Sequence, residues 1–278
     1  MRRKTFRFCT IMDSFDYLCA KYKSMTHHIN DIYRLRVFTL QDLQKDTGLP
    51  LQTLVAMVYR WQKQGLTLSV RKGLYCAVDL ATGEAIADRY EIGSRISGTA
   101  YIAYHTALEF HGLSHQPFYQ AYVISSSRFR PFVFEGISYE YCRETIGEDG
   151  VYTPSGNPKV RVTDVERTLV DCIDRLDRCG GIEELLHCME GISLLDEKKI
   201  RKYLDAYGKS FLYQKTGFLL ERIQAQSGIS DDLIEYCKSK GTAAVTRLTG
   251  EDSDTYLREW NFYVPSFILN TGYNHELI

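Results

Sequence analysis

The sequence predicts an α+β protein with two domains, at residues 1–80 and 81–278. The length of 278 residues suits two domains of roughly 100–200 residues each. In the second part short strands come first and helices gather after them, which is the order of an α+β domain. The charge divides at the same place, because residues 1–78 contain thirteen Lys and Arg against five Asp and Glu, whereas residues 79–278 contain twenty-one against thirty.

A basic module joined to an acidic body indicates that the first part binds nucleic acid. Half of the basic excess precedes Met12, in Arg2, Arg3, Lys4 and Arg7. From Met12 to Val78 the counts are nine against five, so the asymmetry is smaller if translation starts at Met12 rather than at Met1. The early cations form either an arm that follows a DNA groove or a solvated tail ahead of the true start, and the second interpretation is favoured.

Hydrophobic residues make up 44% of the chain, which is enough to build a core. None of the apolar runs approaches the roughly 18 residues that a membrane span requires. The eight cysteines are scattered without a Cys-x-x-Cys pair, and no secretory leader is recognisable. We therefore expect a cytoplasmic protein with reduced thiols and no membrane partner.

Two consecutive helices are predicted in the first part. Thr39 has the character of an N-cap, and Asp42 suits the positive end of the helix dipole. Gly48 ends this short helix, because glycine readily adopts a positive φ. Pro50 suits the first turn of the next helix, at about residues 51–64, where its missing N–H costs nothing.

The second helix is amphipathic. Its apolar stripe is Leu51, Leu54, Val55, Val58 and Trp61, at offsets 0, 3, 4, 7 and 10. Its other side holds Gln52, Thr53, Ala56, Tyr59, Arg60 and Lys63, with no acid. Gln and Arg can contact base edges and Lys can bind phosphate. Taken alone, the helix favours an ordinary amphipathic helix with a solvated polar face over a DNA-binding one.

A basic hairpin follows this helix. Residues 66–70 alternate as a strand does, Arg71, Lys72 and Gly73 make a turn, and residues 74–78 return as a second strand. Two helices followed by such a hairpin predict a winged helix-turn-helix, in which the second helix enters the major groove and the wing contacts the backbone. A winged helix that only docks a protein is the alternative.

The second domain is predicted to be a small sheet followed by a helical half. Residues 81–90 form a connector with helical character, and a helix runs from about Thr99 to Gly112. Strands are expected at residues 121–125, 132–134, 137–142 and 160–162, and Glu135 and Gly136 make a tight hairpin turn. A terminal strand is expected at residues 260–269.

The best-marked helix of this domain begins at a capping box, with Thr163 as the cap and Glu166 three residues later. Its apolar positions are Val165, Leu169, Cys172, Ile173 and Leu176. Arg167 and Asp171 share one side of it at i, i+4 spacing. Further helices are expected at residues 182–189, 196–207, 211–226 and 230–238.

Neither a catalytic nor a metal site is predicted. The candidate metal ligands are His105, His111 and His115, and separately Cys172, Cys179, His187 and Cys188, but their spacings match no common zinc pattern. The acids Asp164, Glu166, Asp171 and Asp174 are interpreted as a cap plus a solvated face. The chain contains no phosphate loop and no nucleophile elbow.

Three segments carry a family resemblance when taken together. They are residues 37–43 with Gly48 and Gly73-Leu74-Tyr75, residues 103–108 with His111-Gly112-Leu113, and residues 162–171 with residues 217–221 downstream. The block from Glu166 to Leu169 is the most specific part. Over about residues 30–225 the chain resembles the AbiEi antitoxins of type IV toxin–antitoxin systems, which are also transcriptional regulators.

In that family a winged helix binds inverted repeats in its own promoter and represses the operon. The C-terminal domain counters a nucleotidyltransferase-like toxin, generally without a stable complex. By matching position, the resemblance implies contacts to double-stranded DNA from Gln52, Thr53, Arg60, Lys63, Arg71 and Lys72. The recognition helix departs from the pattern in holding only two basic residues, the wing is short, and residues 226–278 lie outside the resemblance.

We therefore expect a DNA-binding repressor with a non-enzymatic antitoxin body, without a cofactor or a metal, acting as a monomer or as a dimer assembled on DNA. Two alternatives stay open. One is a nuclease-like enzyme that the winged helix targets to DNA. The other is a winged-helix docking module that does not bind DNA.

Overall fold

The computed structural model describes residues 28–250 and 253–270. The chain divides into two compact units, of which the first ends at Ile96 and the second begins at Ser97. The early cations that precede Met12 lie outside the described residues. Both units mix helices with small sheets, so the predicted α+β class is confirmed.

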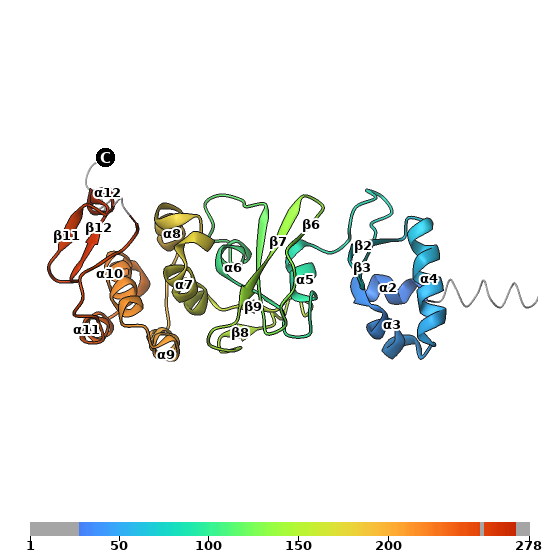
Figure 1. Cartoon of the computed structure of the whole chain (residues 1–278), viewed down its shortest axis with the longest axis horizontal. Coiled ribbons are helices and arrows are strands. Elements are labelled where there is room, and N and C mark those ends of the chain that lie inside the picture. The colour runs from blue at the N-terminus through green and yellow to red at the C-terminus, as the bar shows by residue number, and fades with distance from the viewer. Residues whose placement is uncertain (1–27, 251–252, 271–278) are drawn as a thin grey trace, which may run out of the picture. The chain divides into compact units, whose positions relative to one another are not determined.

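The first unit combines short helices with three strands (Figure 1). Its elements are α2 (Ile29–Leu35), β1 (Val37–Thr39), α3 (Leu40–Thr47), α4 (Leu51–Lys63), β2 (Thr67–Arg71), β3 (Leu74–Ala77) and α5 (Arg89–Ser94). The three strands form an antiparallel sheet in the order β1-β3-β2. The predicted helices and hairpin are present, while α2 and β1 are additional elements.

The helix ends of this unit follow the local sequence signals. Thr39 caps α3, since the backbone N–H of Asp42 donates to its hydroxyl and the Asp42 carboxylate accepts from the backbone N–H of Thr39. Gly48 ends α3 at a φ of 69°. Pro50 occupies the N-cap of α4, whereas the sequence predicted it in the first turn of this helix.

The apolar stripe predicted for α4 is partly wrong. Leu54, Val58 and Trp61 are buried as expected, and Met57 joins them. Leu51 and Val55 are 42% and 52% exposed. The buried face is therefore rotated around the helix, because α2, α3 and the sheet cover α4 on the Met57 side.

The division between the units lies at a different position from the predicted one. The segment that follows β3 is not helical at residues 81–87, and α5 begins only after its cap Asp88. Arg36 donates to Glu91 at 2.7 Å, and Arg95 pairs with Asp42 at 2.7 Å. These two ion pairs tie residues 81–96 to the first unit, whereas the sequence assigned them to the second domain.

The second unit is built around a six-stranded mixed sheet. Its strands are β4 (Tyr101–Ile102), β5 (Gln120–Ser125), β6 (Phe132–Phe134), β7 (Ile137–Arg143), β8 (Val151–Tyr152) and β9 (Val162–Thr163), in the order β6-β7-β5-β4-β9-β8. The hairpin between β6 and β7 turns at Glu135 and Gly136, whose φ values are 45° and 79°. That turn and the strands at 121–125, 132–134 and 137–142 are confirmed.

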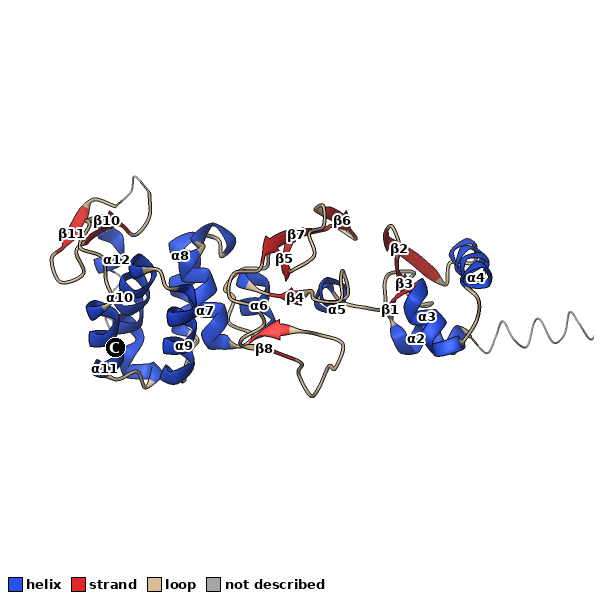
Figure 2. Cartoon of the chain, turned by 60° about the horizontal axis from the view of Figure 1, so that its bottom comes forward, coloured by secondary structure: helices blue, strands red, loops and turns tan. Residues whose placement is uncertain are grey.

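Most helices of this unit follow the six-stranded sheet in the chain, as predicted, whereas α6 (Tyr104–Phe110) lies between β4 and β5. The later helices are α7 (Val165–Asp174), the 3-10 turn η1 (Leu176–Arg178), α8 (Gly181–Glu190), α9 (Glu197–Tyr207), α10 (Ser210–Ser227), α11 (Asp231–Ser239) and α12 (Ser266–Asn270). Figure 2 shows α6 and α7 between the sheet and the later helices. One continuous core joins these elements, so the sheet and the helical half belong to the same unit.

Four local predictions in this unit are wrong. The strand expected at residues 160–162 is β9, which comprises Val162 and Thr163. The helix expected from Thr99 begins only at Tyr104, because residues 101–102 pair as β4. The cap of α7 is Asp164, whose carboxylate accepts from the backbone N–H of Arg167, while Thr163 is part of β9. The terminal strand is short: β12 (Phe262–Val264) pairs with β10 (Thr246–Arg247) and β11 (Thr255–Leu257), and α12 follows it.

Within the described ranges the structure contains no helix both long and apolar enough to cross a bilayer. In the same ranges all six cysteines are buried, and none of them forms a disulfide. The expected reduced state of the thiols matches this arrangement.

Candidate functional site

The outward face of α4 holds most of the predicted DNA contacts. Gln52, Thr53, Arg60 and Lys63 are all exposed. The side chain of Lys63 lies over the ring of Tyr59, with its Nζ 5.6 Å from the ring centroid. Because the core side of this helix is fully packed, its outward side is available to a partner.

The remaining two predicted contacts lie at the hairpin. Arg71 is the last residue of β2 and is half-buried, whereas Lys72 is exposed in the turn. The turn closes at Gly73, whose φ of 83° is one that glycine adopts without strain. The structure therefore places both cations where β2 meets β3, on the strand pair that packs beside α4.

Acidic side chains are absent from this whole stretch of the sequence, since neither Asp nor Glu occurs between Thr47 and Val78. The acids of the first unit are used elsewhere. Asp46 pairs with Arg34 at 2.5 Å, Asp42 with Arg95, and Glu91 with Arg36. Three cations of this unit are thus neutralised locally, and no carboxylate of the α4–hairpin segment opposes an anion.

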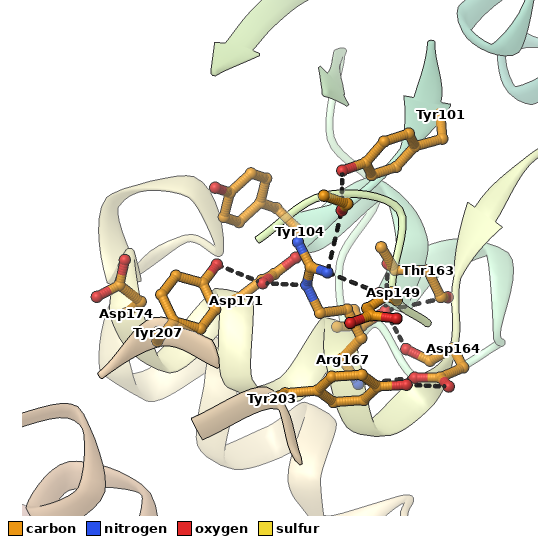
Figure 3. A network of polar contacts seen from close by, with 12 residues as sticks. Tyr101, Tyr104, Asp149, Thr163, Asp164, Arg167, Asp171, Asp174, Tyr203 and Tyr207 are labelled. Carbon is orange, nitrogen blue, oxygen red and sulfur yellow. Dashed lines mark hydrogen bonds and ion pairs between the residues drawn. The ribbon is translucent and has the colours of Figure 1, made fainter. Parts of the chain in front are cut away.

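A buried polar network occupies the second unit, centred on Arg167 of α7 (Figure 3). Its Nε donates to Oδ1 of Asp171 at 2.7 Å, and its Nη1 donates to the carbonyl oxygen of Asp149 at 2.7 Å. Tyr207 of α9 donates to the same Asp171 oxygen at 2.6 Å. The network thereby joins α7, α9 and the loop before β8.

Charge and burial act against each other in this network. Burial alone would lower the pKa of Arg167, but the carboxylate of Asp171 raises it above its usual value. Burial raises the pKa of the Asp171 carboxyl, and the guanidinium offsets only part of that rise. Burial, together with the charge of Asp171, also raises the pKa of Tyr207, so its hydroxyl stays a donor.

The sequence predicted a cap plus a solvated face for Asp164, Glu166, Asp171 and Asp174. This prediction is wrong at Asp171, which is fully buried. The i, i+4 spacing had placed Arg167 and Asp171 on one side of the helix, and this geometry is confirmed. Periodicity could not reveal that the side faces inward, because the partners that make burial tolerable come from Asp149 and Tyr207, far away in the sequence.

Two other acids converge at a surface hollow of about 530 Å³ beside α7. Asp164 and Glu166 line it together with His111, Tyr152 and Lys199. The Nζ of Lys199 lies 3.1 Å from Asp164 and 3.2 Å from Glu166. An ammonium group therefore occupies the position between the two carboxylates that a divalent cation would need.

Two of the three histidines in the first candidate metal set approach the same carboxylate, that of Glu184. His105 is buried, stacks on Phe118 at 3.7 Å between ring centroids and contacts Glu184 at 3.2 Å. His111 lies 2.8 Å from the carbonyl oxygen of Thr163 through its Nε2. His115 is largely exposed, and its Nδ1 lies 3.9 Å from the same Glu184 carboxylate. The described residues nevertheless contain no cluster of His, Cys, Asp and Glu suited to a metal ion.

The cysteines of the second set do approach one another. Cys172, Cys179 and Cys188 all belong to the core, whereas His187 is exposed on α8. Burial raises the pKa of the Cys172 and Cys188 thiols, and each neighbouring thiol adds to that effect. Because all three thiols pack within the apolar core and the described residues contain no group suited to a metal ion, this cluster is interpreted as core packing.

Comparisons with known proteins give a match at the level of structure alone. No family model matches the chain, and no curated protein matches its sequence. Among solved structures, the crystal structure of the RV2827C protein from Mycobacterium tuberculosis is similar, with a TM-score of 0.59 and 16% sequence identity. The match covers 89% of this chain and 93% of that chain. The chain therefore resembles this mycobacterial protein in fold over nearly its whole length.

Proposed function

We propose that the first unit is a winged helix-turn-helix that binds double-stranded DNA. In this proposal α4 lies in the major groove, and the turn between β2 and β3 contacts the phosphate backbone. The observation that carries the proposal is the chemistry of this segment. Its exposed positions hold amide, hydroxyl and cationic groups, and it contains no carboxylate from Thr47 to Val78.

The six side chains divide between two roles. Gln52, Thr53 and Arg60 can contact base edges, because amide and guanidinium groups form paired hydrogen bonds with adenine and guanine. The cations Lys63, Arg71 and Lys72 bind phosphates. A single copy has few cations, so its affinity for DNA is low. Two copies bound to one inverted repeat, as a dimer assembled on the DNA, would supply the missing affinity.

The biological role in this proposal is that of an AbiEi-type antitoxin. The protein represses its own operon and counters a nucleotidyltransferase-like toxin, and the second unit is an antitoxin body without catalysis. The family resemblance supports this role. The second unit adds a chemical argument, because its central carboxylates are already engaged, Asp171 by Arg167 and Asp164 by Lys199.

A binding titration tests the DNA-binding part. The full chain is titrated onto its own upstream DNA and onto a scrambled duplex, at two salt concentrations. We expect tight, stepwise binding to the upstream fragment and weaker, salt-sensitive binding to the scrambled one. The variant with Arg60→Ala and Lys63→Ala should lose the preference for the upstream fragment.

A matched control removes two exposed cations of the second unit, Lys198→Ala with Arg258→Ala, which should leave binding intact. Equal loss in both double variants would mean that binding depends on overall charge alone. Unchanged binding after removal of Arg60 and Lys63 would show that α4 is not the recognition helix.

Growth rescue tests the antitoxin part. The gene of the neighbouring reading frame is induced with and without this protein, and we expect rescue by the wild-type chain. The Arg60→Ala, Lys63→Ala variant should still rescue, because these residues belong to the DNA-binding unit. If the wild-type chain does not rescue growth, the proposed antitoxin role is wrong even where DNA binding is found.

One observation favours a second candidate, a docking module for another protein. Leu51, Val55 and Tyr59 are large apolar residues exposed on α4. Capture of one defined protein partner through this helix, together with no binding to either duplex at low salt, would favour docking over the proposed function.

A further inference from the structure

An apolar row runs along the exposed side of α4. Leu51, Val55 and Tyr59 are 42%, 52% and 60% exposed. They are four residues apart, so they stand above one another along the helix. The same helix buries Leu54 and Trp61 in the core of the unit, which means that the exposed row is not needed for packing.

The surroundings of this row are polar and basic. The positions that point away from the core most directly are Gln52, Ala56, Tyr59 and Lys63, at offsets 0, 4, 7 and 11. Val55 borders this strip on one side and Arg60 borders it on the other. Apolar groups, one amide and two cations thus share one surface, and no acid of the α4–hairpin segment lies among them.

This combination fits the major groove at A·T base pairs. The C5-methyl group of thymine is the apolar feature that this groove presents, and adenine offers the acceptor and donor pair that a glutamine amide matches. The cations beside the row suit a polyanion and not an apolar protein groove. Contacts with the C5-methyl groups of thymine therefore explain why a cationic helix exposes an apolar row.

We propose that α4 recognises thymine in the operator. Leu51 and Val55 contact thymine C5-methyl groups, and Gln52 forms hydrogen bonds with an adjacent adenine. This inference rests on the proposed DNA binding and deepens it, since it names Leu51, Val55 and Gln52 as specificity-determining residues and an A·T-containing half-site as their ligand.

The test removes the methyl groups without changing the base sequence. The upstream fragment is amplified once with dTTP and once with dUTP, and the full chain is titrated onto both products. Uracil keeps the hydrogen-bonding groups of thymine but lacks its methyl. We expect the uracil fragment to bind roughly tenfold more weakly, which is the discrimination that one good base contact provides.

A variant links this loss to the helix. Val55→Ser removes apolar surface at a half-exposed position. Circular dichroism is used to check that the variant folds. The variant should weaken binding to the thymine fragment. It should also bring the ratio of the affinities for the thymine and uracil fragments closer to one, because the Val55 side chain and the thymine methyl contact each other in the proposed complex. Leu80→Ser is the matched control, since Leu80 is 69% exposed in the same unit but outside α4. It should keep the wild-type ratio.

Each outcome decides the question. Equal binding of the wild-type chain to both fragments, above its binding to a scrambled duplex, overturns thymine recognition and leaves the proposed function standing. Absence of binding to either fragment overturns both. Self-association of the chain that Val55→Ser abolishes, with an unchanged thymine-to-uracil ratio, identifies the row as a contact between copies and overturns the inference.

Discussion

The guanidinium of Arg167 donates to the carboxylate of Asp171 at 2.7 Å, and neither side chain exposes any surface to solvent. One turn of α7 separates the two residues, so the pair forms within the helix. Its outer contacts are to the Asp149 carbonyl and the Tyr207 hydroxyl. The second unit therefore has a charged centre where most domains have an apolar one.

Replacing Asp171 with Asn should strongly destabilise the second unit, because the charge of Arg167 is then buried without a countercharge. Breaking such a pair from one side typically costs about 3–5 kcal/mol in the free energy of unfolding. Denaturant unfolding measures it, and in a Trp61→Phe background Trp260 reports the second unit alone. Asp177→Asn is the control, because it breaks an exposed pair with Arg175 that is worth at most about 1 kcal/mol. Similar losses in the two variants would contradict the structural role assigned to burial.

Gly217 of α10 should not tolerate alanine. A Cβ atom there would lie 2.4 Å from the ring of Trp260 and 2.6 Å from Cβ of Cys237. Helix propensity alone would favour alanine by about 1 kcal/mol. The overlap should reverse the sign and destabilise the second unit by about 1–3 kcal/mol, measured by denaturant unfolding. Gly156→Ala, which meets no neighbouring atom, should change stability little, and a stabilised Gly217→Ala would refute the close packing of α10.

The second unit should lose stability in mildly acidic solution through His111. Burial lowers the pKa of His111, although its hydrogen bond to Thr163 and the nearby acids oppose the shift. As pH falls below about 6.5, the unfolded chain therefore takes up the proton first, and stability declines toward the lower pKa of the folded state. Thermal unfolding at several pH values measures this. His111→Gln should flatten the profile below about pH 6.5. A profile that persists in this variant but disappears in His187→Gln would show that the pH dependence does not come from His111.

Lys72 should contribute to DNA affinity without contributing to sequence preference. In the proposed complex Lys72 contacts phosphate and no base, so Lys72→Ala should weaken binding to the upstream and scrambled duplexes alike. The slope of log affinity against log salt should fall by about 1. Lys198→Ala, in the second unit, should leave the slope unchanged. A change in base preference without a change in the salt slope would show that Lys72 contacts the bases and not the phosphate backbone.

Local signals of the sequence proved sufficient where the decisive contacts are local. The cap formed by Thr39 and Asp42 and the turn at Glu135 and Gly136 involve only neighbouring residues, and both are found where they were predicted. The capping signal at Thr163 was misassigned by one position. Thr163 is held in β9 by pairing with Val151, and this leaves Asp164 as the first free cap.

Periodicity was less decisive because α4 has two overlapping apolar rows. Leu54, Val58 and Trp61 fit one row, while Leu51 and Val55 extend it to the side. Which row is buried depends on the elements packed against the helix, and α2 was not recognised. The predicted start of α6 was wrong for a similar reason, since residues 101–102 pair with β5 and the helix begins only at Tyr104, whose φ is 54°.

The candidate interface could be predicted because exposed polar residues on a helix need no distant partner to be placed. The Arg167 network could not, because its partners lie in Asp149, Tyr203 and Tyr207. From the sequence alone, Arg167 and Asp171 look like an ordinary ion pair on the surface of a helix.

The late part of the chain closes the core of the second unit, and this affects the order in which the molecule is made. Phe262, Val264 and Ile268 are completely buried, and β12 is the central strand of its sheet. On the ribosome the first unit is complete once Ile96 has emerged, whereas the second waits until β12 has been synthesised. Domains fold as units in the order of their synthesis. A nascent chain that stalls before Phe262 therefore carries a complete helix α4 while its second unit still has an open core.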